Sequence, residues 1–389
     1  MEKRKWFLRV TSLIMTAGIL LGNVMTAFGE ESAPAVDGSE LEVAIILQEG
    51  GLGDQGYNDG AKEGLDLMTE KYGVTGVLVE AVGAAEADTF VRQLAEEGYP
   101  LIICLDWTII DYVKEASVDY PETYFVVLGK SLPGPGTQEN LIEPYTALHE
   151  RGFLSGLASI LFAMDEYEII ESKAREGCTV AMMNPGESVN YNRNTAAYQQ
   201  VAAEICPDAV IISDYTASKT DTALNATIAE NLIKNNGVEV IWPNIGTGSL
   251  SVYTACAQNN AYAVGVDINQ DNLEPGTMIT SGLHNTTYMV TNIIEEYLKG
   301  ALCGTNEYYW GLASGVVGLT DMSVIGEYAE NKENYEKIVS IIKDYEEKII
   351  SGEFVVYNYF VEGEILFDEW QEAHPGVDYS EWVNAGRPE

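Results

Sequence analysis

Short apolar runs alternate with stretches of helical apolar spacing along most of the chain. The runs form two sets, one covering 41–47, 75–82, 100–107 and 123–129 and the other covering 178–183, 209–215, 238–244 and 261–267, and a further run follows at 276–283. Strands that alternate with helices indicate βαβ units and parallel sheets, and nearly continuous apolar strands indicate sheets that are covered on both faces. The pattern therefore predicts an α/β protein with two Rossmann-like lobes and a ligand cleft between them.

A long helical stretch at 143–164 separates the two sets of strands. We expect the N-terminal lobe to contain 41–145 plus about 270–320, and the C-terminal lobe to contain 146–269 plus about 321–365. The segment 326–352 has the pattern of a charged amphipathic helix, and a small hairpin is expected after it. Residues 366–389 are expected to be a C-terminal tail in loop conformation.

The N-terminus has the pattern of an export signal. A basic start, an apolar stretch and the small residues Ala27 and Gly29 predict a signal peptide at 1–29, followed by a polar linker at 30–40. An uncleaved membrane anchor is the alternative. The first cysteine is Cys104, so the cysteine of a lipoprotein signal is missing. We therefore expect a secreted or cell-surface protein.

Composition excludes several classes of function. The net charge of −39, from 60 acidic and 21 basic residues, disfavours nucleic-acid and anionic-lipid partners, because phosphate binding needs clustered Lys and Arg. The chain has three histidines, and no hydrolase, zinc-protease or nucleotide-binding motif occurs in a suitable context. Five widely spaced cysteines contain no CxxC pair. We expect a non-enzymatic protein without a metal or cofactor.

Residues suited to binding follow the strands instead. Ligands of parallel α/β folds bind at loops beyond the carboxyl ends of the strands. Aromatic rings that can stack, together with carboxylate, amide and imidazole groups, occur at these positions, namely Tyr57, Asn58, Trp107, Trp242, Asn244, Asp267 and His284. The set favours a small aromatic or sugar-like solute. Both tryptophans can equally belong to the core.

Four stretches, 49–65, 147–159, 237–270 and 278–290, resemble motifs of the basic membrane protein family of solute-binding proteins. Among them, "GVDINQ" and the preceding "GTG" resemble a fairly specific part of the family pattern. The resemblance implies a type I periplasmic-binding fold and a receptor that delivers a purine nucleoside to the permease of an ATP-binding-cassette (ABC) importer. A monomeric receptor with lobes that close by a hinge is expected.

The resemblance also implies roles for single residues. Tyr57 matches the aromatic residue that stacks on the base, Asn58 its polar neighbour, Asp267 the acid that binds ribose hydroxyls, and Gly246 a glycine against the sugar. The alternatives are an ordinary turn tyrosine, a helix cap for Asn58, and plain turn residues for Asp267 and Gly246.

Three positions depart from the family pattern. Gln48 stands where an aspartate contacts the base edge, and Glu49 is its possible substitute. His284 replaces a basic residue that helps to hold the sugar, unless it is a plain surface histidine. Lys219 replaces a second stacking aromatic residue, for which Tyr215 or Trp242 can compensate. A receptor or sensor for sugars or other small metabolites therefore remains the alternative, and a secreted nucleoside hydrolase is less favoured.

Overall fold

The computed structural model describes residues 37–80, 83–129, 134–173 and 177–358. The predicted signal peptide, most of the linker and the predicted tail at 366–389 lie outside the described residues. The same holds for most of the hairpin expected after residue 352, and its described part, 353–358, contains no strand.

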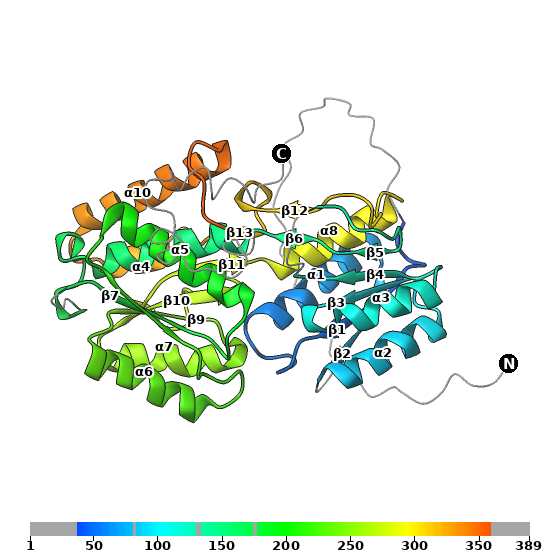
Figure 1. Ribbon diagram of the computed structural model, residues 1–389, viewed down its shortest axis with the longest axis horizontal. Coiled ribbons are helices and arrows are strands. Elements are labelled where there is room, and N and C mark those ends of the chain that lie inside the picture. Colours follow the sequence, from blue (N-terminus) through cyan, green and yellow to red (C-terminus); the bar gives the residue numbers. More distant parts are fainter. Residues whose placement is uncertain (1–36, 81–82, 130–133, 174–176, 359–389) are drawn as a thin grey trace, which may run out of the picture. The chain divides into compact units, whose positions relative to one another are not determined.

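The first sheet consists of parallel strands in the order β2-β1-β3-β4-β5 (Figure 1). Its strands are β1 (Glu42–Leu47), β2 (Thr75–Glu80), β3 (Leu101–Cys104), β4 (Tyr124–Val127) and β5 (Leu141–Ile142). The helices that connect them are α1 (Tyr57–Tyr72), α2 (Ala84–Glu97) and α3 (Ile110–Asp119). A one-turn 3₁₀ helix, η1 (Trp107–Ile109), precedes α3.

The second sheet has the order β13-β11-β10-β9-β7-β8. Its strands are β7 (Thr179–Met183), β8 (Val210–Asp214), β9 (Val240–Pro243), β10 (Tyr262–Asp267), β11 (Met278–His284) and β13 (Val317–Leu319). All pairs are parallel except β11 with β13, which is antiparallel. Its helices are α4 (Leu148–Ala163), α5 (Val189–Ile205), α6 (Thr222–Asn236) and α7 (Ser249–Gln258).

Alternate residues of each central strand pack on opposite faces, as a sheet covered on both sides requires. In β7, Val180 and Met182 belong to the core with α4 and α5, whereas Ala181 and Met183 belong to the core with α6 and α7. Figure 1 shows these two helix pairs on opposite faces of the second sheet. The predicted α/β fold with two parallel-sheet lobes is confirmed.

The chain passes between the sheets at three places. It leaves the first lobe after β6 (Tyr145–Thr146), returns to that lobe after β11 into α8 (Thr286–Leu298), and leaves it again between β12 (Tyr309–Trp310) and β13. Strands β6 and β12 pair with each other in a separate two-stranded sheet. Helix α8 packs against α1 of the first lobe. The last described helices are α9 (Ser323–Tyr328) and α10 (Lys332–Ser351).

One expected lobe boundary needs correction. The sequence pattern assigned about 270–320 to the N-terminal lobe, but β11 and β13 both lie in the second sheet. The return to the first lobe occurs only after His284, at the start of α8. A short apolar strand carries no signal for the sheet that it joins, because both sheets accept the same type of strand.

Candidate ligand-binding site

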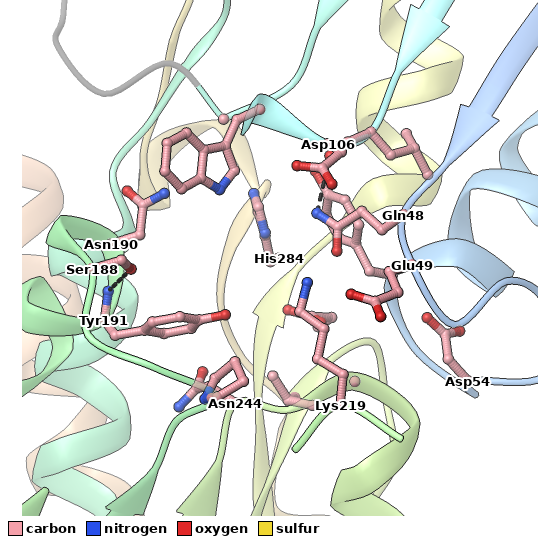
Figure 2. A pocket seen from close by; sticks show the side chains of 18 of the residues that line it. Gln48, Glu49, Asp54, Asp106, Ser188, Asn190, Tyr191, Lys219, Asn244 and His284 are labelled. Atoms are coloured by element: carbon pink, nitrogen blue, oxygen red, sulfur yellow. Dashed lines mark hydrogen bonds between the residues drawn. The ribbon is translucent and has the colours of Figure 1, made fainter. Parts of the chain in front are cut away.

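A cavity of about 510 Å³ lies at the carboxyl ends of strands from both sheets (Figure 2). In each sheet the strand order reverses at one central pair, β1 with β3 and β7 with β9. Loops that follow these four strands line the cavity, beginning at Gln48, Leu105, Pro185 and Asn244. This is the location that doubly wound sheets favour for ligands, because the connections diverge there to opposite faces.

The loop after β1 is held by its own side chains. The Asp54 carboxylate accepts hydrogen bonds from the backbone N–H groups of Gly56 and Asn58, both at 2.9 Å, and of Asp59 at 3.1 Å. These bonds satisfy donors at the start of α1 that have no partner within the helix. Burial nevertheless raises the pKa of Asp54, and the three hydrogen bonds partly oppose the shift. Asp54 thus fixes the direction in which α1 leaves the cavity.

Asn58 braces the same loop from inside. Its Oδ1 accepts a hydrogen bond from the backbone N–H of Gln48 at 2.9 Å, and its Nδ2 donates to the carbonyl of Gly51 at 3.0 Å. The side chain is buried, although the residue lines the cavity. Through these contacts Asn58 stabilises the loop after β1. This role differs from the helix cap, which was the alternative that the sequence left open.

Gln48 presents one half of its amide to the cavity. Its Nε2 donates to the carbonyl of Leu105 at 3.0 Å, which joins the loops after β1 and β3. The Oε1 atom, an acceptor, remains for other partners. Figure 2 shows Gln48 beside Asp106 and Glu49, so acceptor groups gather on this side of the cavity.

Tyr57 and His284 stack against each other, with ring centroids 4.9 Å apart and an angle of 29° between the planes. Tyr57 is only 7% exposed, so His284 covers much of the ring that the resemblance assigns to stacking. Burial, with a smaller contribution from the charge of Arg151, lowers the pKa of His284 well below its usual value. His284 is therefore a neutral aromatic neighbour of Tyr57.

Aromatic surface is exposed to the cavity at two other positions. Trp107 lines the cavity and is 37% exposed, consistent with its place in the short helix η1 at the end of β3. Tyr191, in the first turn of α5, also points into the cavity (Figure 2). Burial and the nearby charge of Asp267 raise the pKa of Tyr191 to about 12, so its hydroxyl stays protonated near neutral pH. Either ring can offer a face to a flat ligand.

A buried ion pair forms the floor of the cavity. Arg151 Nη1 donates to Asp267 Oδ1 at 3.0 Å, and Nη2 donates to Asn244 Oδ1 at 3.4 Å. The guanidinium carbon lies 5.1 Å from the ring centroid of Trp242. Asp267 ends β10 with φ 71°, a left-handed conformation that Asp and Asn tolerate better than most residues.

The cavity collects eight of the nine site residues expected from the sequence: Gln48, Glu49, Tyr57, Asn58, Trp107, Gly246, Asp267 and His284. Trp242 is the exception. Its side chain is fully buried, its Nε1 donates to the carbonyl of Gly265 at 3.2 Å, and its ring stacks on Tyr198. The expectation that Trp242 walls the cavity is wrong, because its ring faces the core and the underside of Arg151.

Sequence reasoning did not single out Arg151 or Tyr191 as site residues. Arg151 carried a usable signal, since it is a lone arginine within the largely apolar stretch "ALHERGFLSGLASILFAM". A buried arginine needs a partner, and Asp267 is that partner here. Tyr191 carried little signal, because its segment precedes the apolar part of α5 in a polar run. Lys219, noted only as a departure, does line the cavity (Figure 2).

Two kinds of feature are absent from the described residues. No cluster of three or more His, Cys, Asp or Glu side chains there has the arrangement of a metal site. No helix among those residues combines the length and the apolar character that a membrane crossing requires.

Comparison with known proteins identifies the family. Residues 41–359 match the family described as "ABC transporter substrate-binding protein PnrA-like". Basic membrane protein A1 of Borrelia garinii is 22% identical over 324 residues, which cover 82% of this chain and 90% of the relative. The ABC transporter nucleoside-binding protein BmpA of Lactococcus lactis is 22% identical over 333 residues, which cover 79% of this chain and 90% of the relative.

Solved structures agree on the fold. The crystal structure of an ABC transporter solute-binding protein from Aeropyrum pernix has a TM-score of 0.68 at 22% identity, covering 80% of this chain and 92% of that one. A glucose-galactose binding protein from Geobacillus stearothermophilus has a TM-score of 0.51 at 14% identity, covering 72% and 96%. The family resemblance seen in the sequence motifs is confirmed. This chain belongs to the Bmp family of ABC transporter substrate-binding proteins, and it is a solute-binding receptor and not an enzyme.

Proposed function

We propose that this receptor captures a purine nucleoside in the cavity and delivers it to the permease of an ABC importer. The observation that carries the proposal is the pairing of aromatic surface at Trp107 and Tyr191 with the carboxylate of Asp267 in one cavity. A flat base can stack on the rings while ribose hydroxyls donate to the carboxylate. A nucleoside-binding protein among the relatives supports the same ligand class.

The structure changes which ring is proposed to stack on the base. Tyr57 has His284 against its face, whereas Trp107 is exposed to the cavity. We therefore assign the main stacking contact to Trp107, with Tyr191 as the second ring. Gln48 Oε1, Glu49 and Asp106 would accept hydrogen bonds from the N–H groups of the base edge.

We also place the protein outside the cytoplasm, as a monomer at the cell surface or released from it. The signal peptide predicted at 1–29 supports this location, as do relatives whose names describe a membrane protein and a lipoprotein. N-terminal sequencing of the mature protein tests it, since an intact residue 1 with no attached membrane would contradict export.

A sugar receptor is the second candidate. The polar floor formed by Arg151, Asp267 and Asn244 suits hydroxyl groups, whether or not a base is attached to the sugar. Tyr57 is mostly covered, which reduces the aromatic surface available to a base.

Isothermal titration of the protein with inosine, guanosine, adenosine and a panel of sugars separates the two candidates. We expect a nucleoside to bind with Kd below about 100 μM, equivalent to about −5.5 kcal/mol. Trp107→Ala should then weaken nucleoside binding by about 1–3 kcal/mol, the usual value of base stacking on an aromatic ring. Tyr112→Ala, which removes an exposed ring of α3 outside the cavity, is the matched control. Tight sugar binding without nucleoside binding would contradict the proposal.

A further inference from the structure

Arg151 is an unusual residue for its position. It lies in the first turn of α4, a helix in which every residue is buried, and its own exposed fraction is 5%. Burial of a charged group is unfavourable unless partners compensate it, and burial lowers the pKa of this guanidinium from its usual value. An apolar residue would pack there at lower cost, so the arginine requires an explanation beyond packing.

The partners of Arg151 use only part of its hydrogen-bonding capacity. Of its five N–H donors, one is directed to Asp267 and one, at 3.4 Å, to Asn244. In the described ranges, Arg151 Nε and Asn244 Nδ2 are buried without a hydrogen-bond partner. Asp267 likewise has a second oxygen, Oδ2, that takes part in no hydrogen bond found there. The floor therefore combines unused donors with an unused acceptor.

Arg151 is also the cation nearest to Asp267. His284 is neutral, because burial and the charge of Arg151 itself lower its pKa. The other charge acting on Asp267 is that of Asp54, which is negative. The positive charge that the family resemblance places at residue 284 is thus absent there, and Arg151 supplies it from α4.

We propose that Arg151 determines specificity for ligands that carry two neighbouring hydroxyl groups. A carboxylate only accepts hydrogen bonds and a guanidinium only donates them, whereas a hydroxyl does both. One hydroxyl of the ligand donates to Asp267, and the adjacent hydroxyl accepts from Arg151 or Asn244. A ligand that lacks either hydroxyl leaves a buried charged group with an unmade hydrogen bond.

This inference rests on the proposed function in one respect, the choice of ribonucleosides as probes. The ribose of a ribonucleoside has neighbouring 2′ and 3′ hydroxyls, and 2′-deoxy and 3′-deoxy analogues each lack one. Sites that hydrogen-bond a ligand hydroxyl discriminate strongly against its absence. We expect the wild-type protein to bind the ribonucleoside roughly 10- to 100-fold more tightly than either deoxy analogue.

The experiment measures Kd values for a ribonucleoside and its two deoxy analogues with wild-type protein and variants. Arg151→Met keeps an unbranched aliphatic side chain and removes the charged guanidinium group, so the preference for the ribonucleoside should fall to about threefold or less. Arg151→Lys keeps the charge and should retain part of the preference. Arg92→Met is the matched control, because Arg92 pairs with acidic residues on the surface of α2 and α3. The preference of this variant for the ribonucleoside should equal that of the wild type.

The outcomes of this experiment distinguish failure of the inference from failure of the proposed function. Equal weakening of ribonucleoside and deoxynucleoside binding by Arg151→Met would assign Arg151 a structural part only and overturn the inference. If Arg151→Met does not fold, the double variant Arg151→Met/Asp267→Asn, which removes both charges, takes its place. Failure of every nucleoside to bind overturns the proposed function alone, and D-ribose and 2-deoxy-D-ribose then become the probe pair. Absence of a preference between those two sugars would overturn the inference as well.

Discussion

Asp267 combines a left-handed backbone, a buried carboxylate and a single charged partner, and these features make its titration measurable. Burial raises its pKa to about 6 from an ordinary 3.8, while Arg151 opposes the shift. Between about pH 4 and pH 6 the folded protein therefore binds a proton that the unfolded chain has released. The contribution of Asp267 to the free energy of unfolding falls as pH rises through this window, by at most about 3 kcal/mol.

Replacement of Asp267 by Asn should remove this contribution. Asn fits the left-handed conformation, so the backbone is not strained by the change. We expect the difference in unfolding free energy, wild type minus Asp267→Asn, to decrease as pH rises from 4.5 to 7. Urea denaturation at several pH values measures it, and the other carboxylates cancel because both proteins contain them. A difference that stays constant with pH would show that Asp267 titrates near its ordinary value.

The cavity residues differ in how well they could be predicted from the sequence. Tyr57 lies after the loop that follows β1, Trp107 lies just after β3, and Asp267 ends β10. The carboxyl end of a strand places such residues at the cavity without further information. Trp242 also follows this rule in sequence but is buried, because it is the third residue of β9 and its ring takes the core face. Arg151 lies in a helix that no strand-end rule covers, and only its pairing with a residue 116 positions away explains it.

At the scale of elements, Gly64 decides how closely α1 approaches α8. A Cβ atom at this position would lie 2.9 Å from the carbonyl oxygen of Thr287 and 2.9 Å from Cβ of Val290. The carbonyl belongs to the backbone of α8 and cannot rotate away as a side chain can. Glycine is unfavourable inside a helix by about 1 kcal/mol relative to alanine, so its presence here indicates the contact between the helices.

Gly64→Ala should therefore destabilise the protein despite the better helix propensity of alanine. We expect a loss of about 1–3 kcal/mol in the free energy of unfolding, typical of an overpacked interface. Glu70→Ala, at an exposed position of the same helix, should change it by less than about 0.5 kcal/mol. Chemical denaturation of both variants provides the measurement. A gain in stability for Gly64→Ala would mean that α1 and α8 can separate at little cost.

Most elements were predictable because their signals are local. Apolar runs marked the strands, and glycines such as Gly73, Gly98 and Gly237 end α1, α2 and α6 in the left-handed conformation. Local sequence did not show which sheet each strand joins. Strands β11 and β13 illustrate this, since their pairing in the second sheet is set by contacts with β10 and with each other.

At the scale of the whole molecule, both sheets use one strand order. The first runs β2-β1-β3-β4-β5, and the second runs β8-β7-β9-β10-β11 before the antiparallel β13. Each sheet therefore contributes the same pair of loops to the cavity, those after its first and third strands in chain order. The loop after β1 is also tied to the second lobe, since Gln270 Nε2 donates to the carbonyl of Gln55 at 2.6 Å. A ligand in this cavity contacts loops from both sheets.

Hydrogen exchange tests whether loops of both lobes contact the ligand. Binding stabilises the segments that contact the ligand against local opening, and more distant segments change little. With the tightest ligand of the titration panel, we expect slower exchange in 48–58 and 105–108 of the first lobe and in 185–191 and 244–248 of the second. Helix α10 lies outside the cavity lining and provides the internal control. Protection confined to the loops of one sheet would contradict capture between the two lobes, and it would place the ligand on a single lobe instead.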